Sequence, residues 1–258
     1  ANPQTSTSVP VSKHSSNSSS SEGPDMNLKI PPPPFFITII FKREDIYLFH
    51  NALESYRKLI SPVISVVIPS LIKAARAEND FVIVTVFVNP TQFGPTEDYA
   101  AYPRTLESDC KMAEREGADL VFAPAPGEMY PHEDMTWVEV TGPITKVLCG
   151  RTRPIHFRGV ATVCAKFFNL TQCDRAYYGL KDAQQTQVLQ RMVEDLFMNV
   201  TLRLMPIVRE KDGLAKSSRN VYLSPKEHKA ALVLSRSLRH AKEAYGKGER
   251  SKKALVDL

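Results

Sequence analysis

The chain has 258 residues, of which 43 % are hydrophobic and 24 % are charged, an ordinary composition for a globular protein with one large domain, alone or with a smaller piece. No stretch approaches the roughly 18 uninterrupted apolar residues of a membrane-spanning helix, so the sequence predicts none. The net charge is +5, and residues 209–258 hold 13 Lys or Arg against 6 Asp or Glu, an excess of +7 that leaves about −2 elsewhere. This basic end lacks the interleaved aromatic residues of a nucleic-acid surface. We expect a phosphate-bearing small ligand or a solvated helix face there.

The cysteines form no CxxC pair and have no metal-ligand spacing with histidine: Cys110, Cys149, Cys164 and Cys173. Buried free thiols in a reducing compartment are therefore expected, and the predicted location is the cytoplasm.

Residues 1–34 hold nine serines and seven prolines with few large apolar residues, which predicts a disordered extension. After it, Phe35–Phe41 has the pattern of a strand, Glu44–Leu59 that of a helix, and Val63–Ile68 that of a second strand. The first parallel strand of a sheet is expected within residues 35–69.

From Ser70 the pattern alternates between helix and strand, which predicts crossover units and a parallel sheet. Ser70 is the expected N-cap of a first helix, and Gly117 is the expected stop of a later one. The other predicted helices are Thr105–Glu116, Phe157–Leu170, Ala183–Met192 and a basic helix from Pro225 to Tyr245. The predicted strands are Phe81–Val88, Asp119–Ala123, Trp137–Val140, Arg175–Tyr178 and Val200–Leu204.

The run Phe81–Gly94 is the stretch most suggestive of a site. Its apolar part is typical of a strand buried on both faces, and it ends in a loop that carries Asn89 and Gln92. Ligands of open α/β sheets bind where the carboxyl ends of strands open into loops. The alternative is a turn in which the two amides only cap backbone groups.

Two further segments have the chemistry of an anion site. Gly179–Gln185 lies where a predicted strand passes into a helix, so glycine, a helix N-terminus and Lys181 coincide. Lys216–Asn220 places two hydroxyls between two cations, which suits a polyphosphate. Each could instead be a solvated loop or cap. His156 could act as a base, although a histidine before a helix is more often a cap or packing residue.

Several motifs in order resemble the pantoate–beta-alanine ligase (pantothenate synthetase) family over about residues 70–245: FVNPTQFGP, YPRT, DLVFAP, MYP, RPIHFRGV, GLKDAQQ, VREKDGLAKSSRN and YLSP. The resemblance implies an α/β fold with a Rossmann-like parallel sheet of the nucleotidyltransferase type and a partial small C-terminal lid domain. The implied divisions are an extension over 1–34, a nucleotide- and pantoate-binding domain over 35–208 and the lid over 209–258.

The resemblance also implies an activity, in pantothenate and coenzyme A biosynthesis. ATP and Mg²⁺ would activate pantoate as pantoyl adenylate with release of pyrophosphate, and beta-alanine would then attack to give pantothenate and AMP. A homodimer is implied, with no nucleic-acid or membrane partner.

Site roles follow from the family's motifs. Gln92 and Gln185 would contact pantoate, with Gln92 near beta-alanine. The nucleotide would be bound by Gly179, Leu180 (in place of the family's glutamate), Lys181, Asp182, Val208, Lys216, Ser217, Ser218 and Arg219. Lys181, Ser217, Ser218 and Arg219 would be the catalytic residues, since cations and donors stabilise charge on the phosphorus centre. The loop 211–220, with almost nothing apolar to pack, is expected to be mobile and to order over phosphates.

The sequence departs from the family ahead of Ser70. A proline-threonine-methionine-glycine stretch and two histidines three apart are expected there, but residues 64–69 read ISVVIP and no two of the six histidines have that spacing. The C-terminal domain is also expected to continue past Leu258. These departures predict slow adenylation, and they leave open a relative that only binds pantoate or nucleotide, or only dimerises.

Overall fold

The computed structural model describes residues 39–40, 68–94, 106–133, 135–217, 220 and 222–257, which all fall within one compact unit, Pro32–Leu258. The strands are β1 (Ile39–Ile40), β2 (Ile83–Thr85), β3 (Leu120–Phe122), β4 (Arg175–Gly179) and β5 (Thr201–Met205). The helices are α2 (Ile68–Glu78), α3 (Leu106–Arg115), α4 (Pro126–Met129), α5 (Cys149–Thr152), α6 (His156–Thr171), α7 (Ala183–Asp195), α8 (Pro225–Gly246) and α9 (Lys252–Val256). Short 3₁₀ turns are η1 (Pro90–Gln92), η2 (Pro143–Thr145) and η3 (Leu180–Asp182).

The described strands form one sheet in the order β3-β2-β1-β4-β5. β2 pairs with β3 and β4 pairs with β5 in parallel, and β1 runs antiparallel to both β2 and β4. Because β1 opposes both of its neighbours, the other four strands all run in the same direction. Their carboxyl ends therefore lie at one edge of the sheet, as the sequence predicts.

The direction of β1 differs from that of the parallel strand predicted in this part of the chain. A first parallel strand is expected within residues 35–69, but the strand described there, Ile39–Ile40, pairs antiparallel on both sides, and residues 41–67 lie outside the described residues. A short apolar run indicates burial but does not record the direction in which the chain crosses the sheet. The predicted helix Glu44–Leu59 and nearly all of the predicted strand Val63–Ile68 lie outside the described residues, as does the extension 1–34.

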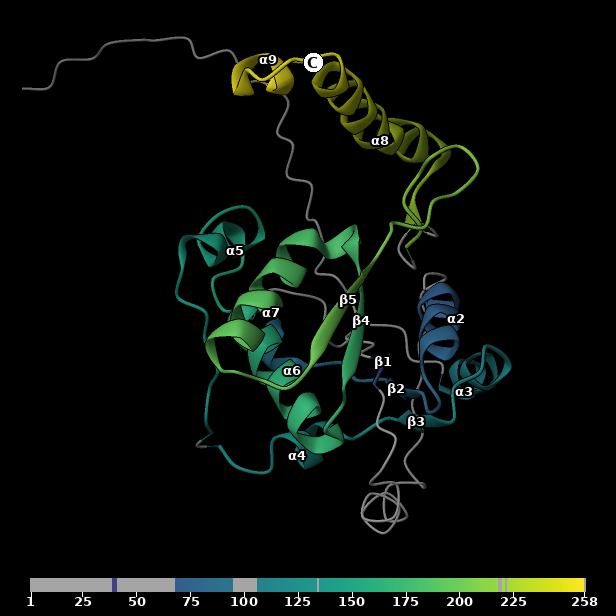
Figure 1. The fold of residues 1–258 in the computed structure, drawn as a ribbon, viewed down its shortest axis with the longest axis vertical. Coiled ribbons are helices and arrows are strands. Elements are labelled where there is room, and N and C mark those ends of the chain that lie inside the picture. The colour runs from purple at the N-terminus through teal and green to yellow at the C-terminus, as the bar shows by residue number, and fades with distance from the viewer. Residues whose placement is uncertain are drawn as a thin grey trace, which may run out of the picture. The chain divides into compact units, whose positions relative to one another are not determined.

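Two apolar cores sandwich the sheet. On one face α6 and α7 pack against Ile83 and Tyr178, and on the other α2 and α3 pack against Val84 and Tyr177. Figure 1 shows these helix pairs on opposite sides of the strands. Adjacent residues of a strand point to opposite faces, so Ile83 and Val84 enter different cores. Nearly continuous apolar strands are thus explained by burial on both faces.

Local signals place several helix ends. α3 ends at Arg115 and is followed by Gly117 with φ of +99°, a left-handed conformation that glycine adopts without strain and that was predicted to stop the helix. At the start of α8, the Ser224 hydroxyl accepts a hydrogen bond from the Glu227 backbone, and the Glu227 carboxylate accepts one from the Ser224 backbone. This reciprocal cap explains why the basic helix begins at Pro225, as predicted.

Three predicted elements differ from the structure. α2 starts at Ile68, so Ser70 lies inside its first turn and is not the N-cap; Pro69 fits that turn because it lacks an amide hydrogen. β2 covers only part of the predicted strand Phe81–Val88. Residues 137–140 form no strand, because Val138 exchanges backbone hydrogen bonds with the Thr162 hydroxyl of α6 (3.0 and 3.3 Å) and not with a neighbouring strand.

The thiols differ in exposure. Cys164 and Cys173 are buried, as predicted, and burial raises the pKa of each to about 12. Cys149 is exposed and Cys110 is half-buried, so the prediction of buried thiols holds for only two of the four. Cys149 directly follows a turn, where the sequence has no periodic apolar pattern that would indicate burial or exposure. Cysteine spacing alone could not reveal that it is exposed.

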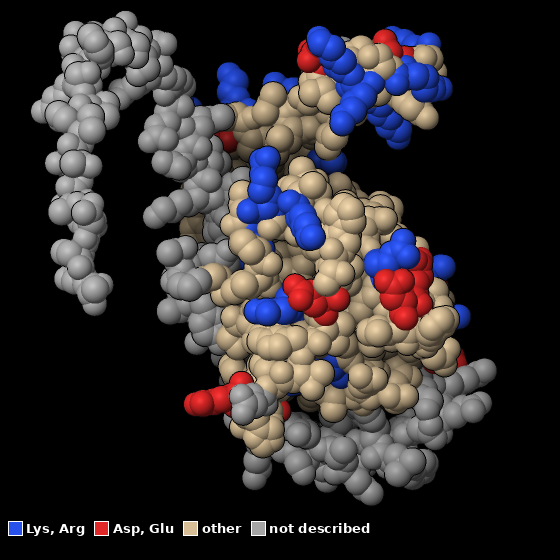
Figure 2. Space-filling model, turned by 90° about the vertical axis from the view of Figure 1, so that its left-hand side faces the viewer, with Lys and Arg blue, Asp and Glu red and all other residues tan. Residues whose placement is uncertain are grey.

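The positive charge predicted for the C-terminal part is borne by helices α8 and α9. Residues 225–257 hold nine Lys or Arg and four Asp or Glu. Figure 2 shows blue Lys and Arg side chains gathered on the segment at the top, which carries these helices. Among the described residues, no helix is both long and apolar enough to cross a membrane.

Candidate functional site

The loop that follows β2 forms the 3₁₀ turn η1, and Gln92 is its last residue. Asn89 caps this turn, because its side-chain oxygen accepts a hydrogen bond from the Thr91 backbone N–H (3.4 Å). Both amide side chains are buried, Asn89 at 1 % and Gln92 at 2 % exposure. Capping thus accounts for Asn89, whereas the side chain of Gln92 needs another explanation.

The start of α6 packs directly on η1. Arg153 Nη2 donates to the Gln92 carbonyl oxygen (3.2 Å), and Nδ1 of His156 lies 3.3 Å from the same oxygen. Gly159 lies so close that a methyl group there would sit 2.5 Å from the Thr91 carbonyl oxygen and 2.7 Å from the Gln92 backbone. His156 is buried and its ring packs on Phe157, which favours the packing role over that of a base.

The loop after β4 forms η3 and leads into α7. Gly179 ends the strand, and Leu180, Lys181 and Asp182 make the turn. Lys181 Nζ lies 3.3 Å from Asp182 Oδ1, and both side chains are about one third exposed. Ion pairs with this exposure contribute at most about 1 kcal/mol, so Lys181 can exchange Asp182 for a ligand anion at little cost.

Two glutamines at the start of α7 differ in role. Gln185 is half-buried in the first turn. Gln184 donates to the carbonyl oxygens of Ile144 and Val147 (2.7 Å each) and accepts from the Cys149 N–H (3.1 Å). Gln184 therefore fixes the segment around η2 to α7, a structural role that its sequence position did not reveal.

The chain after β5 doubles back as a hairpin. Arg209 bridges Ala215, and Lys216 N–H donates to the Val208 carbonyl oxygen (2.9 Å). Val208, predicted at the adenine, and Lys216, predicted at the phosphates, are thus brought together. Lys216 Nζ lies 3.9 Å from Glu210. Ser217 is half-buried, while Ser218 and Arg219 lie outside the described residues.

The hairpin corrects one expectation. Leu214 is only 8 % exposed, and Glu210 N–H donates to the Leu214 carbonyl oxygen (2.7 Å) while Gly213 N–H donates to the Glu210 carbonyl oxygen (3.0 Å). The first half of the loop 211–220 therefore has an apolar anchor and its own hydrogen bonds. A single leucine among charged residues gave too weak a signal to predict this.

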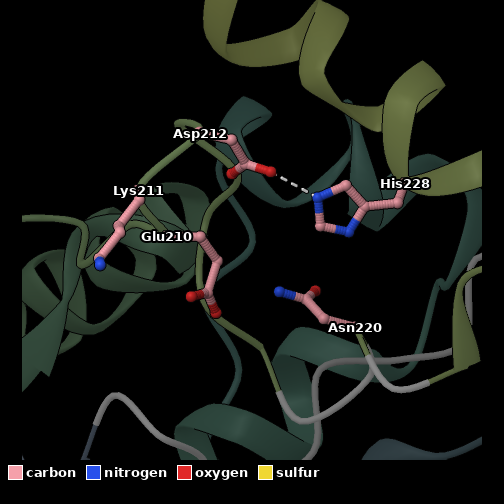
Figure 3. A pocket seen from close by; sticks show the side chains of 5 residues that line it. All are labelled: Glu210, Lys211, Asp212, Asn220 and His228. Carbon is pink, nitrogen blue, oxygen red and sulfur yellow. Dashed lines mark hydrogen bonds and ion pairs between the residues drawn. The ribbon is translucent and has the colours of Figure 1, made fainter. Parts of the chain in front are cut away.

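An open cavity of about 560 Å³ lies beside this hairpin, lined by Glu210, Lys211, Asp212, Asn220 and His228. Figure 3 shows Asp212 and His228 joined across one side, with Lys211 directed away from them. His228 Nε2 lies 2.6 Å from Asp212 Oδ2, and this contact is the main reason that the Asp212 pKa lies below its ordinary value. Asn220 ends the predicted polyphosphate segment Lys216–Asn220, but none of the five has an individual predicted contact, and the mixture of charges favours no one ligand.

The sheet topology relates the predicted segments. η1 follows β2, η3 follows β4 and Val208 follows β5, so all three leave the same edge of the sheet. β2 and β4 flank β1. After β1 the chain first extends the sheet on one side, with β2 and β3, and then on the other side, with β4 and β5, so the strand order switches at β1. This is the position at which open α/β sheets bind ligands. A buried amide, a glycine turn and two half-buried lysines at this edge can bind a carboxylate and an anionic phosphate chain.

Sequence reasoning singled out Gln92 but missed what supports it. Tyr130 donates a hydrogen bond from its hydroxyl to Asn89 Oδ1 (2.7 Å), and Gly159 admits η1 against α6. Tyr130 is 41 residues from Asn89, so no local pattern links them. The only sequence signal for Tyr130 and Gly159 is that they lie in two motifs that carry the family resemblance, MYP and RPIHFRGV respectively.

Comparison with known proteins shows the family to which the chain is related. The family model of pantoate-beta-alanine ligase matches residues 69–257. Pantothenate synthetase of Acetivibrio thermocellus is 56 % identical over 186 residues, 72 % of this chain and 66 % of the relative, and that of Roseiflexus castenholzii is 58 % identical over the same shares. The chain thus spans about two thirds of the length of these curated relatives.

Solved structures give the same result. A crystal structure of pantothenate synthetase from Thermus thermophilus is similar with a TM-score of 0.68 and 53 % identity, covering 70 % of this chain and 65 % of that one. Pantoate-beta-alanine ligase from Francisella tularensis, complexed with beta-gamma ATP and beta-alanine, has a TM-score of 0.66 and 33 % identity over 78 % of this chain and 79 % of that one. The predicted nucleotidyltransferase-type α/β fold is confirmed, and the chain belongs to the pantoate-beta-alanine ligase family.

Proposed function

We propose that the chain catalyses the ATP-dependent condensation of pantoate with beta-alanine to pantothenate. The observation that carries the proposal is the buried amide of Gln92, held in the loop after β2 beside the switch point of the sheet, in a chain 56 % identical over 186 residues to a pantothenate synthetase. A buried polar side chain at a ligand-binding edge has a cost unless it finds partners, and a substrate oxygen is such a partner.

The first step is an attack of the pantoate carboxylate on the α-phosphorus of ATP. An acyl–phosphate bond forms, the bond to the β-phosphate oxygen breaks, and pyrophosphate leaves with that electron pair. Gln92 and Gln185 bind pantoate, Gln92 from the turn η1 after β2 and Gln185 from the first turn of α7. In the second step the beta-alanine amine attacks the carbonyl carbon and loses a proton, and AMP departs.

The nucleotide is bound by the segment Gly179–Asp182 and by the hairpin after β5. Leu180 has no donor in its side chain, so this part of the turn contacts the nucleotide only through its backbone. Val208 contacts the adenine, and Lys216, Ser217, Ser218 and Arg219 contact the phosphates. Lys181, Ser217, Ser218 and Arg219 stabilise the charge that develops on the transferring group. The hydrogen bond from Lys216 to Val208 supports this arrangement, because it joins the two ends of the nucleotide site.

The site suits Mg²⁺ that is bound mainly through the phosphate oxygens of ATP. Among the described residues, no group of three or more His, Cys, Asp or Glu side chains could bind a metal ion by itself. Mg²⁺ commonly uses one or two carboxylates together with phosphate oxygens, and Asp182 supplies a carboxylate in the nucleotide segment. Bound there, the ion would neutralise charge on the departing pyrophosphate.

We also propose that the chain works as a homodimer in the cytoplasm, in pantothenate and coenzyme A biosynthesis, without a nucleic-acid or membrane partner. The family relation supports this role. Size-exclusion chromatography with light scattering tests the dimer, and a mass near 28.9 kDa would contradict it.

Product formation tests the proposed function. We expect pantothenate, measured by mass spectrometry, only when pantoate, beta-alanine and ATP are all present. Because the histidine pair is absent, the reaction should be slow. A variant in which the family's two-histidine segment replaces the residues ahead of Ser70 should react at least about 10²-fold faster, the usual effect of one preorganised transition-state donor.

The outcomes separate the alternatives. Failure of both proteins to make pantothenate would overturn the ligase and leave a binding protein. Equal rates would show that the histidine pair is dispensable here.

A further inference from the structure

Asn89 is the centre of a buried hydrogen-bond network around η1. Its Nδ2 donates to the Gly159 carbonyl oxygen (3.1 Å) and to Gln92 Oε1 (3.2 Å). Its Oδ1 accepts from the Thr91 N–H (3.4 Å), the Thr91 hydroxyl (2.9 Å) and the Tyr130 hydroxyl (2.7 Å). At 1 % exposure, Asn89 has little access to water, so these partners determine its orientation.

Two backbone partners fix the positions of the oxygen and the nitrogen of the Asn89 side-chain amide. The Gly159 carbonyl can only accept a hydrogen bond, and the Thr91 N–H can only donate one. Turning the amide over would place N–H against N–H and oxygen against oxygen. The end of Gln92 that faces Asn89 must therefore be its oxygen, and Gln92 directs its Nε2 amide hydrogens elsewhere.

Tyr130 completes the network from a second side. Burial is the main reason that its pKa is raised to about 12, so the phenol stays protonated and able to donate at any working pH. The Tyr130 ring also has contacts that do not involve its hydroxyl: Lys166 Nζ lies 4.5 Å from the ring centroid, and the Phe87 ring centroid lies 6.2 Å from it. Lys166 also donates to the Met129 carbonyl oxygen.

We propose that Tyr130 is a positioning residue, which fixes Gln92 through Asn89 so that Gln92 presents amide hydrogens to the substrate. The partner at this position must then be a hydrogen-bond acceptor, a carboxylate or hydroxyl oxygen of a small hydroxy acid. This rests on the proposed function in taking pantoate as that acid. It adds the direction of the hydrogen bond and a side chain that reinforces it.

Tyr130→Phe is the sharpest test, because it removes only the hydroxyl and keeps the ring contacts. Pantoate affinity, measured by titration calorimetry, should fall about five-fold, the usual effect of losing one hydrogen bond. ATP affinity should not change, since the contacts described for Tyr130 are with Asn89, Thr91, Phe87 and Lys166 and with no described residue of the nucleotide segments. Tyr177→Phe is the matched control: it also removes a hydrogen-bonded phenol, one whose partners are Asn79 and Glu78, and it should leave pantoate affinity unchanged.

A double-mutant cycle separates positioning from general loosening of the structure. If Tyr130 acts through Gln92, Tyr130→Phe should have no further effect on pantoate affinity in a Gln92→Ala background, measured at millimolar pantoate by ligand NMR. The side-chain amide signals of Gln92 should also move towards exposed values in Tyr130→Phe. A merely structural role would lower affinity equally in both backgrounds.

Each result has one meaning. Failure of the unmodified chain to bind pantoate would overturn the proposed substrate, and the Gln92 amide signals would still report whether Tyr130 orients that side chain. Binding by the unmodified chain, with unchanged affinity and unchanged Gln92 signals in Tyr130→Phe, would overturn the positioning role alone.

Discussion

Gly159 of α6 lies against the backbone of η1, and its lack of a side chain is what permits this contact. A methyl group would meet the Thr91 carbonyl oxygen at 2.5 Å and the Gln92 backbone at 2.7 Å. These neighbours are backbone atoms, which cannot move aside as the end of a flexible side chain can. The position of Gln92 therefore depends on a glycine that no turn or left-handed conformation requires.

Gly159→Ala should destabilise the fold and displace Gln92. Overpacking of this kind typically costs about 1–3 kcal/mol, and pantoate affinity should fall with it. Denaturant unfolding and calorimetry would measure the two effects. Gly127→Ala is the control, because nothing lies within 4 Å of the added methyl in α4 and a helical Gly→Ala change is neutral or slightly stabilising. Identical behaviour of the two variants would contradict the proposed tight contact.

At the scale of single residues, the sequence indicated which groups carry chemistry but not what holds them. Asn89, Gln92 and Lys181 could be predicted because polar residues directly follow apolar strands. Tyr130 could not, since its contact with Asn89 joins segments 41 residues apart. The exposure of Cys149 likewise depends on packing that cysteine spacing does not record.

Among the elements, α2 is joined to β4 and β5 by a polar network at its C-terminal end. Arg203 of β5 donates two hydrogen bonds to the Glu78 carboxylate (2.8 and 3.0 Å), and the Tyr177 hydroxyl of β4 donates a third (2.9 Å). The bond from Arg203 is the largest reason that the pKa of Glu78 lies below its ordinary value. The network ties one helical layer to the sheet.

Glu78→Gln should lower stability at neutral pH and lose its effect in acid. Because the pKa of Glu78 is lower in the folded state than in the unfolded state, the ionised carboxylate stabilises the fold fully at pH values above its unfolded pKa of about 4.3. This stabilisation is lost as the pH falls through the pKa of the folded state. Because both side chains are partly exposed, we expect about 0.5 kcal/mol at pH 7. Unfolding of both proteins between pH 7 and pH 3 measures it, and a difference that persists unchanged below pH 4 would contradict the account.

The hairpin after β5 should be partly ordered before nucleotide binds. Gly213 and Lys216 amides are hydrogen-bonded to Glu210 and Val208 carbonyls, so both should be protected from hydrogen exchange without ATP. Added protection on ATP binding is expected at Ser217 and Ser218. Exchange measured with and without ATP tests this, and no gain at the two serines would count against their role at the phosphates.

Element types could largely be predicted, as could the parallel direction of β2 to β5, while the direction of β1 and the short extent of β2 could not. The helices α3, α6, α7 and α8 begin and end within a few residues of their predicted bounds, because their apolar periods and caps are local. The antiparallel direction of β1 depends on its neighbours on both sides. Val138 resembled a strand residue, but its backbone partner is a threonine side chain of α6.

For the whole molecule, the parallel strands and their two apolar cores account for the site. Four strands that run in one direction bring the loops after β2, β4 and β5 to one edge, and burial on both faces holds them there. The alternation of apolar runs and helices was enough to predict this arrangement. The division of the chain at residue 209 stays a prediction.

Pantoate binding at this edge is the claim on which the proposed function depends most directly. Calorimetry should detect pantoate binding to the unmodified chain, and Gln92→Ala and Gln185→Ala should each weaken it at least about ten-fold, because both remove a hydrogen bond to a charged or hydroxyl oxygen. Gln190→Ala is the control, since that exposed glutamine of α7 contacts only Glu194 among the hydrogen bonds described, and it should bind pantoate as the unmodified chain does. Equal pantoate affinity in all four proteins would contradict the assignment of this edge as the substrate site.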